Sequence, residues 1–350
     1  MIFEKIRAQF QKQLPFVVYS KPDNNSVIGL FQKDATLHVV EDYHEEGFIF
    51  APFDGNTTIL IPVSASETII EPISFFPIEE NTAVSFIDSD SQEEHEALVQ
   101  KGIDAINRNI FSKVVLSRKE IVPLVDYDLI NSFQRILNYY PSAFSYCFFH
   151  PATGLWMGAF SEQFLKTENH TLTTAALAGT QQLNGHNDDV IWQHKEKEEQ
   201  EIVTRFIVDH LSKVVSDLHY SLPYTIKAGN LAHIKTDITG ILNEQHRLKE
   251  IISILHPTPA VCGYPKEAAK EFIVENEGYD REFYAGFLGE LNYHLRDHST
   301  ITDLFVNLRC MKIEDNKALF FMGGGITKDS IPEKEWFETV HKSMTMKKIL

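Results

Sequence analysis

Short apolar runs dominate the first eighty positions of the chain. Pro, Gly and Asn interrupt these runs, as turns between strands require. The runs predicted to form antiparallel strands are FVVYS (16–20), LHVVED (37–42), GFIFAPF (47–53) and TTILIPVS (57–64). Residues 1–90 are therefore expected to form a β-rich part of the fold.

The middle of the chain mixes helical and strand patterns. A polar, acidic segment at 79–96 is expected to connect the β-rich part to a helix, whose modest apolar stripe ends near Asn109. Three further strands are predicted at 113–118, 142–150 and 154–160. A long helix is expected from Trp192 to about Leu218. Its apolar positions recur at spacings of three and four: Ile202, Val203, Phe206, Ile207, His210, Leu211, Val214, Val215 and Leu218.

The last fifty residues are predicted to hold a strand pair and a closing helix. The strand pair is expected at Asp303–Leu308 and Lys317–Met322, and the helix at 330–348. Ser330 and Glu333 fit a capping box at the start of that helix, where a proline in the first turn is tolerated. Because strands and helices mix without a repeating βαβ order, the pattern favours an α+β fold with large antiparallel sheets.

Composition narrows the class of protein. The 350 residues include 32 Lys and Arg against 49 Asp and Glu, a formal net charge of −17, which argues against binding to nucleic acid or anionic membrane. No run of 18 apolar residues indicates a transmembrane helix, and charges near the N-terminus argue against a secretory signal. Cys147, Cys262 and Cys310 are too scattered for a disulfide framework or structural zinc. We expect a soluble, cytoplasmic protein.

The predicted final helix carries candidate charges. Glu335, Glu338 and Lys342 lie at i, i+3 and i+7 and share one face. Ordinary ion pairing on a solvated face is the alternative. The glycines at 323–325 shortly precede this helix, and glycine allows a ligand close to the backbone while a helix N-terminus favours an anion. A run of glycines alone is most often a turn.

Glu199 and Lys113 are the other candidates. Glu199 extends the inward-facing stripe of the long helix toward its start, and an interior carboxylate must be paired, protonated or metal-bound. The alternative is an acidic first turn stabilised by the helix dipole. Lys113 opens a strand, where a lysine usually guards a sheet edge. Carboxylates from two helices would suit Mg²⁺ better than zinc.

Six motifs in this chain resemble those of the chorismate-utilising enzymes, the isochorismate, salicylate, anthranilate and aminodeoxychorismate synthases, and follow the same order. They are KVVLSR (113–118), LAGT (177–180), LHPTPAVCGYP (255–265), DREFYAG (280–286), LRC (308–310) and GGGI…SIPEKEWFET (323–339). The resemblance implies one chorismate-binding domain over 1–350, with a β-rich part at 1–90 and a catalytic core at 93–350. It also implies the fold of anthranilate synthase component I and aminodeoxychorismate synthase: two large antiparallel sheets packed face to face, with helices outside and the active site between.

Within that family the pattern is most similar to isochorismate synthases. In those enzymes water attacks C2 of chorismate, the double bonds shift and the C4 hydroxyl leaves. The resemblance makes Lys113 the general base toward water and Glu162 the general acid for the leaving hydroxyl. Positioned acid–base groups contribute about 10²–10⁴-fold each. The product would feed menaquinone or catechol siderophore biosynthesis.

The resemblance also implies a binding set. Glu199, Glu335 and Glu338 match glutamates that hold Mg²⁺ on the ring carboxylate, some directly and some through water. A bound Mg²⁺ would act as Lewis acid and template. The positions that match substrate-binding residues are Gly179, Thr180, His256, Arg309, Gly323, Gly324, Gly325 and Lys342.

Particular residues separate the subfamilies. Anthranilate synthases resemble this chain but carry glutamine where Lys113 stands, and aminodeoxychorismate synthases carry a nucleophilic lysine where Ala178 stands. Water is therefore the expected nucleophile, and no glutaminase subunit is expected. Separately, we expect a monomer. The chain departs from the family pattern at Ala176, often proline, at Gln200, often histidine, and at Glu290, often tryptophan.

Two other hypotheses remain open. A salicylate synthase would go on to expel pyruvate from isochorismate, and it shares the expected base and metal ligands. A synthase-like subunit that needs an amide-transferring partner, or an inactive relative that senses chorismate, is the third reading. The lysine at position 113 and the complete carboxylate set argue against the third.

Overall fold

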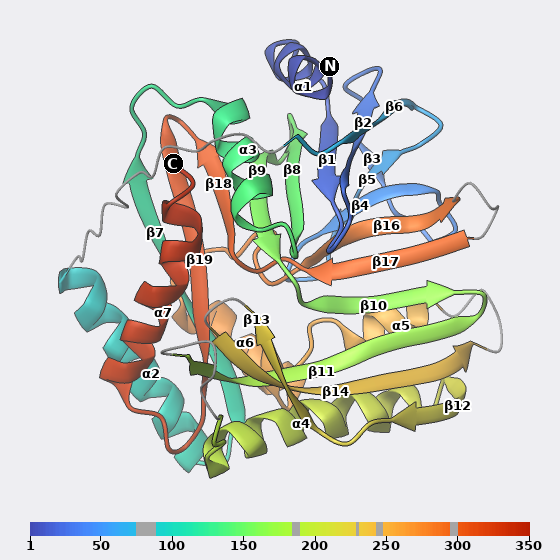
Figure 1. Ribbon diagram of the computed structural model, residues 1–350. Coiled ribbons are helices and arrows are strands. Elements are labelled where there is room, and N and C mark those ends of the chain that lie inside the picture. Colours follow the sequence, from blue (N-terminus) through green and yellow to red (C-terminus); the bar gives the residue numbers. More distant parts are fainter. Residues whose placement is uncertain (75–88, 184–189, 229–230, 243–247, 295–299) are drawn as a thin grey trace.

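The computed structural model describes the chain except for residues 75–88, 184–189, 229–230, 243–247 and 295–299 (Figure 1). Two large antiparallel sheets make up its centre. The nine-stranded sheet has the order β15 (Gly263–Tyr264), β7 (Lys113–Pro123), β19 (Lys317–Ile326), β18 (Cys310–Glu314), β9 (Gly154–Phe160), β8 (Phe144–His150), β1 (Phe16–Ser20), β2 (Ser26–Gln32) and β6 (Ser66–Pro72).

The second sheet is ten-stranded. Its order is β12 (Val215–Tyr220), β14 (Leu231–Leu242), β11 (Thr171–Gln182), β10 (Gln163–Glu168), β17 (Thr300–Val306), β16 (Phe287–His294), β4 (Gly47–Ala51), β5 (Ile59–Pro62) and β3 (His38–Val39). A further strand, β13 (Tyr224–Ala228), pairs with β14. Strands of residues 1–72 therefore lie in both sheets rather than in a unit of their own.

The two sheets pack face to face through aromatic side chains. Phe144 of β8 stacks on Phe305 of β17 with ring centroids 4.4 Å apart, and Phe50 of β4 lies 4.7 Å from Phe148 of β8. Aromatic pairs at these distances stabilise a core beyond the area that they bury. The predicted α+β architecture of two facing antiparallel sheets is confirmed.

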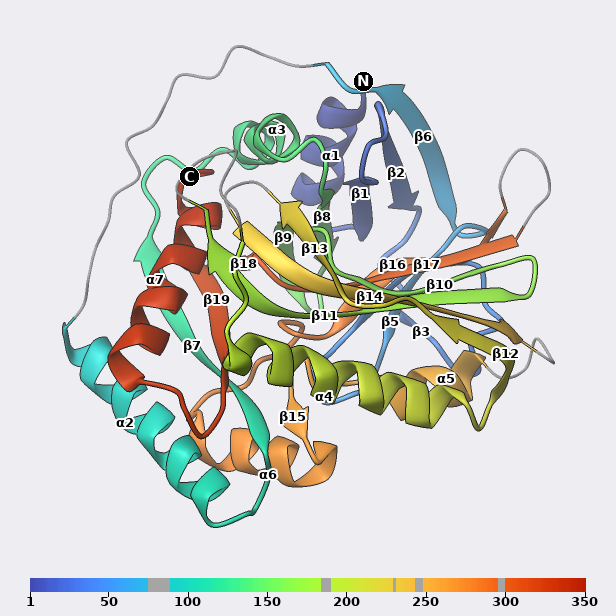
Figure 2. The same ribbon diagram turned by 60° about the horizontal axis from the view of Figure 1, so that its bottom comes forward.

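Helices cover the outer surfaces (Figures 1 and 2). The first and third pack on the nine-stranded sheet, the fourth and fifth on the ten-stranded sheet, and the second and seventh pack together beside β7 and β19. Their bounds are α1 (Ile2–Gln11), α2 (Ser89–Asn107), α3 (Leu129–Tyr139), α4 (His194–Leu211), α5 (Leu248–Leu255), α6 (Lys266–Asn276) and α7 (Pro332–Lys347). None of these described helices is long and apolar enough to cross a bilayer.

Burial on both faces explains the continuous apolar strands. In β1, Val17 and Tyr19 face the opposite sheet, whereas Phe16 and Val18 belong to the cluster under α1 and α3. All of β1 is buried. A strand covered on both sides has no polar face, so the alternation that marks a half-buried strand is absent. The predicted strands at 16–20, 47–53, 57–64, 142–150 and 154–160 are confirmed, and three of them are shorter than predicted: Gly47–Ala51, Ile59–Pro62 and Phe144–His150.

Two local predictions are wrong. The helix predicted to continue to about Leu218 ends at Leu211, because Val215 and its neighbours form β12 against β14. Apolar spacing alone does not separate the two states when both bury their valines. The capping box is also absent: α7 begins after Ile331 with no side-chain cap, and Ser330 Oγ accepts a hydrogen bond from the Thr327 amide instead.

The predicted strand pair at Asp303–Leu308 and Lys317–Met322 is a third error. The first segment forms β17 in the ten-stranded sheet, and the second forms β19 in the nine-stranded sheet. The true partner of β19 is β18, joined to it by a tight turn in which Asp315 and Asn316 both have positive φ. Two such residues are typical of a two-residue hairpin turn.

Candidate active site

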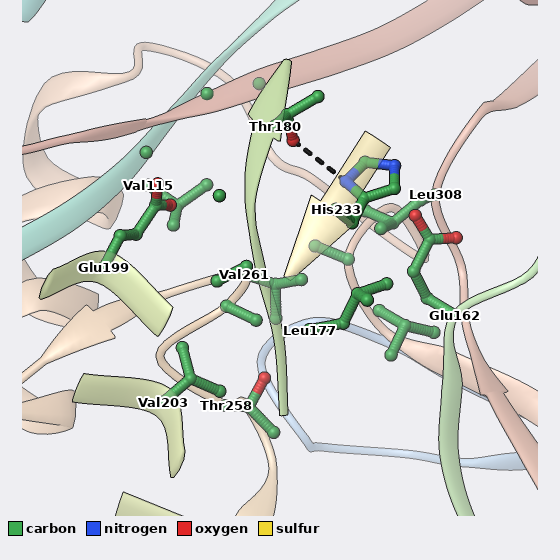
Figure 3. Close-up of a pocket in the computed structure, with 18 of the residues that line it drawn as sticks. Val115, Glu162, Leu177, Thr180, Glu199, Val203, His233, Thr258, Val261 and Leu308 are labelled. Atoms are coloured by element: carbon green, nitrogen blue, oxygen red, sulfur yellow. Dashed lines mark hydrogen bonds between the residues drawn. The ribbon is translucent and has the colours of Figure 1, made fainter. Parts of the chain in front are cut away.

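A cavity of about 400 Å³ lies where one end of β19 meets β10, β11 and β14, within the size range of small-molecule sites. Both sheets contribute to its walls, together with α4 (Figure 3). Helix α7 also contributes lining residues. The acidic and basic residues that line it are Glu162, Lys195, Glu196, Glu199, Arg309, Asp329, Lys334, Glu335, Glu338 and Lys342.

The glycines at 323–325 lie in strand β19 and not in a turn. Strand β7 pairs with this segment along one edge, whereas the pairing with β18 stops at Phe321. Among the described strands, nothing pairs with the second backbone edge of the glycine segment, and the segment lines the cavity. The backbone here can therefore be approached by a ligand.

The absent side chains of this segment make room for carboxylates. A Cβ atom on Gly325 would lie 2.4 Å from Glu199 Oε1. A Cβ atom on Gly324 would lie 3.5 Å from Glu335 Oε2 and 3.6 Å from Glu338 Oε1. The three carboxylates predicted from the sequence thus approach two consecutive glycines.

Lys113 is the first residue of β7 and is fully buried. It does not guard a sheet edge, because β15 covers that side with Tyr264 opposite Lys113. Its Nζ lies 2.9 Å from Glu199 Oε1, in an ion pair without hydrogen-bond alignment. Glu199 is partly exposed and lines the cavity, so it lies in contact with both the cavity and the buried lysine.

Each carboxylate of α7 has its own lysine. Lys195 Nζ donates to Glu335 Oε1 at 2.7 Å, reaching across from α4. Lys342 pairs with Glu338 one turn earlier on α7, and its Nζ also donates to Gly323 O at 2.8 Å. The predicted shared face of Glu335, Glu338 and Lys342 is thus directed at the cavity rather than at open solvent.

The environment separates the two α7 carboxyl groups. Burial raises the pKa of Glu335 above its usual value, against the opposing effect of Lys195. Burial also acts to raise the pKa of Glu338, but Lys342, with Lys195 and Arg309, outweighs it and leaves that pKa lowered. Neighbouring cations favour the ionised form of a carboxyl group, so Glu338 keeps its negative charge more readily.

The opposite wall holds Glu162, Thr180 and His233. Figure 3 shows Glu162 and Glu199 on different sides of the cavity. Glu162 lies between β9 and β10, and Thr180 Oγ1 is 3.1 Å from His233 Nδ1 on the neighbouring strand. Burial lowers the pKa of His233, so its ring favours the neutral form. Gly179 has φ +75°, and the register of β11 against β14 shifts there, which bends the strand at the cavity.

Arg309 occupies the crossing from one sheet to the other. It lies between the end of β17 at Val306 and the start of β18 at Cys310, with φ of 34°. Its carbonyl accepts a hydrogen bond from the Ala159 amide at 3.2 Å. A non-glycine residue in the left-handed region is uncommon and often marks a functional site. The side chain lines the cavity as the sequence predicted.

His256, like the buried Lys113, is a predicted site residue that does not line the cavity. Its Nε2 lies 3.1 Å from the Pro52 carbonyl, and its ring packs edge-on against Phe164 and Phe287. Burial lowers the pKa of His256 to about 4. The histidine therefore supports the wall from behind instead of facing the space in front of it.

Lys195 and His233 are cavity residues that the sequence reasoning missed. Lys195 lies one turn before Glu199 on α4, so the same helical face that singled out Glu199 contained a signal for it. His233 lies opposite Thr180 in the β11–β14 pair. That partnership depends on strand pairing across more than fifty residues of sequence, which no local pattern reports.

The donor set around the glycines consists of carboxylate oxygens, the ligands that Mg²⁺ prefers. In the part of the chain that the structure describes, no three acidic, histidine or cysteine side chains gather closely enough to hold an ion as they stand. Glu335 and Glu338 share the space over Gly324, while Glu199 approaches the next glycine. The residues fit a hard cation held by one pair of carboxylates, with a third nearby.

Residues 65–350 match the family model described as chorismate binding enzyme. The isochorismate synthase EntC of Escherichia coli is 30% identical over 245 residues, which cover 67% of this chain and 61% of that protein. A salicylate biosynthesis isochorismate synthase of Pseudomonas aeruginosa is 28% identical over 274 residues, covering 75% and 56%. The chain thus matches less than two thirds of the length of either relative.

Solved structures share the fold. A putative 2,3-dihydroxybenzoate-specific isochorismate synthase, DhbC, from Bacillus anthracis superposes with a TM-score of 0.78 at 20% identity over 99% of both chains. Anthranilate synthase component I from Streptococcus pneumoniae superposes with a TM-score of 0.68 at 16% identity, covering 94% of this chain and 90% of that chain. The family match, the six motifs and the cavity that those motifs line agree. The chain belongs to the chorismate-binding enzymes.

Proposed function

We propose that this protein is an isochorismate synthase, an isomerase that converts chorismate into isochorismate. Support comes from the family and from relatives that are named isochorismate synthases. The observation that carries the proposal is the buried Lys113, paired with Glu199 at a cavity whose opposite wall holds Glu162. A base and an acid on two sides of one space are what addition of water and loss of hydroxyl require.

In the proposed reaction, Lys113 accepts a proton from the water that attacks C2 of the ring. The two double bonds shift, and the C4 oxygen leaves with a proton from Glu162. One water enters and one leaves, so substrate and product are isomers.

The substrate is a dianion, whereas the chain carries a formal charge of −17. Local cations must therefore reverse the repulsion. Arg309 and Lys342 line the cavity and are proposed to bind the carboxylates, while the open backbone edge at 323–325 and Thr180 complete the pocket. Lys195 adds a further positive charge to the cavity lining.

Mg²⁺ is part of the proposal. Glu335 and Glu338 would hold the ion, and Glu199 would contribute directly or through water. The ion would polarise the ring carboxylate and stabilise charge that develops as the double bonds shift. Lys195 donates to Glu335 Oε1, whereas Glu335 Oε2 is the oxygen that approaches Gly324, so the second oxygen is proposed to bind the ion.

Product analysis tests the proposal. Purified protein, chorismate and Mg²⁺ should give isochorismate as sole product, and EDTA should abolish turnover. Pyruvate with a fluorescent aromatic product would identify a salicylate synthase instead. Conversion only after addition of a glutaminase and ammonia donor, or binding without conversion, would refute an independently active isomerase.

A further inference from the structure

A buried charged cluster lies beside the cavity wall that carries Glu162, and none of its charged residues lines the cavity. Lys21 follows β1 in the nine-stranded sheet and reaches across the interior to the ten-stranded sheet. Its Nζ lies 2.7 Å from Glu290 Oε2 and 2.8 Å from Asp303 Oδ2. Both carboxylates are almost fully buried.

Each of the four carboxylate oxygens in this cluster has a partner. Tyr19 donates its hydroxyl to Glu290 Oε1 at 2.7 Å, and Gln163 donates its side-chain amide to Asp303 Oδ1 at 2.7 Å. Lys21 occupies the two remaining oxygens. Complete pairing is what makes two buried carboxylates tolerable in a protein interior.

Lys21 offsets the repulsion between the two carboxylates that it contacts. Glu290 and Asp303 face each other directly in the β16–β17 pair, and like charges at opposed strand positions repel. Burial acts to lower the pKa of Lys21, but the two carboxylates outweigh it and raise that pKa. The lysine therefore stays charged and holds Asp303 in place. It precedes the part of the chain that matches the family model.

Gln163 links this cluster to the cavity. It follows Glu162 directly and opens β10, where the register against β17 shifts between Gln163 and Leu165. Such a bulge redirects side chains near active sites. The backbone at this point is held by the Val306 amide, which donates to Glu162 O at 2.9 Å, and by the side chain of Gln163 on Asp303.

We propose that Gln163 is a positioning residue: its amide, anchored on Asp303, fixes the bulge that aims the carboxyl group of Glu162 into the cavity. Lys21 supports this anchor from the opposite sheet by neutralising Asp303. This inference rests on the proposed role of Glu162 as proton donor. It assigns residues near the N-terminus a part in the site, although they lie outside the cavity.

A double-mutant cycle tests the inference. Gln163→Met removes the donor at nearly constant size, and we expect kcat for chorismate to fall about tenfold with KM within about twofold, because a small misplacement of a catalytic group is costly. In the Glu162→Gln background, the same change should alter the residual rate by less than about twofold, since Gln163 acts only through Glu162. A loss below twofold in the wild-type background, or equal losses in both, overturns the proposal.

Controls separate positioning from folding. Gln9→Met removes another buried amide donor, on α1 and away from the cavity, and should lower Tm while leaving kcat within about twofold. Lys21→Met should reproduce the kcat loss of Gln163→Met, and Lys21→Arg should restore most of it. A kcat of Lys21→Met within about twofold of wild type, or no recovery of kcat in Lys21→Arg, would contradict the anchor.

A crystal structure of Gln163→Met gives a readout that needs no turnover. The Glu162 carboxyl group should leave its wild-type position, and an unchanged position overturns the proposal. If the wild-type chain converts no chorismate, the proposed function fails, while this comparison still decides whether Gln163 positions Glu162.

Discussion

Two charged regions of this molecule are built from similar residues but are paired differently. At the cavity, Glu199, Glu335 and Glu338 each have a lysine partner. Behind β7, Arg281 and Glu277 form a closed pair in which Arg281 Nε donates to Glu277 Oε2 at 2.7 Å and Nη2 to Oε1 at 2.5 Å. Neither Arg281 nor Glu277 lines the cavity, whereas all three carboxylates of the first region do.

The closed pair holds backbone. Arg281 also donates to the carbonyls of Val115 and Val261, and Glu277 Oε1 accepts from the Ser117 amide. Every polar group of this pair is thus used inside the protein. At the cavity, each carboxylate has one lysine partner, so its oxygens can still accept further bonds. The comparison indicates that the number of partners, rather than burial alone, distinguishes charged residues that stabilise the fold from charged residues that are available to a ligand.

The largest effect is expected from a substitution at the cavity. Lys113→Ala should lower kcat about 10²–10⁴-fold, the range for a positioned general base, while chorismate affinity changes little. Steady-state kinetics and equilibrium binding measure the two quantities. Lys166→Ala, which removes a surface lysine paired with Glu168, is the control. Near-normal turnover without Lys113 would remove it as the base.

Breaking the closed pair should instead affect folding. Arg281→Met leaves Glu277 buried with an uncompensated charge, so the free energy of unfolding should fall by about 3–5 kcal/mol. Arg205→Met is the matched control, because its pair with Glu201 is exposed and contributes at most about 1 kcal/mol. Equal losses in chemical denaturation of the two variants would refute the distinction between closed and open pairs.

Low pH should destabilise the fold through His95, which is buried in its neutral form. Burial lowers the pKa of His95 to about 4, with Arg118 acting in the same direction. Its folded pKa thus lies below the unfolded value near 6.5, so the unfolded chain binds the proton first and stability is lost as pH falls from 6.5 toward 4. Between pH 7.5 and 4.5 the wild type should lose about 2–3 kcal/mol more than His95→Leu.

Denaturant titrations at the two pH values measure this difference for His95. His194→Leu, at an exposed position on α4, should show the wild-type dependence on pH. If His95→Leu loses as much stability as the wild type over this interval, His95 is not the neutral buried group that its surroundings indicate.

The smallest effect is expected from removing the charge of one proposed metal ligand. Glu338→Gln should raise the Mg²⁺ concentration needed for half-maximal turnover by at least about tenfold, and should weaken direct Mg²⁺ binding by the same factor, as loss of metal-site partners does elsewhere. Glu333→Gln changes an exposed glutamate in the first turn of the same helix and should leave the titration unchanged. Identical titrations for wild type and Glu338→Gln would take Glu338 out of the metal site.

Local pattern predicted many elements but few partnerships. The strands at 16–20 and 154–160 match the expected bounds, because their apolar runs are bounded by turn residues. The first helix, α1, was not predicted, and the Asp303–Leu308 segment was assigned the wrong partner. An apolar strand can bury its side chains equally well in either sheet, so its pattern does not choose a neighbour.

The candidate site shows the same limit. Motifs and helical spacing identified Glu199, Glu335 and Glu338, whereas the Lys195–Glu335 ion pair requires α4 and α7 to meet. His256 matched a motif but lies behind the cavity wall. A side chain's type and position along an element follow from sequence, while its direction relative to a distant element does not.

The sequence by itself determined the acidic balance, the α+β class, the order of six motifs and the set of charged residues placed on helix faces. Only the tertiary structure decided which lysine neutralises which carboxylate, that the glycines lie in a strand with one open edge, and that Lys21 reaches Asp303 from the opposite sheet. Spacing along a chain acts over a few residues, but ion pairs and cavities form between atoms that folding brings together from hundreds of residues apart.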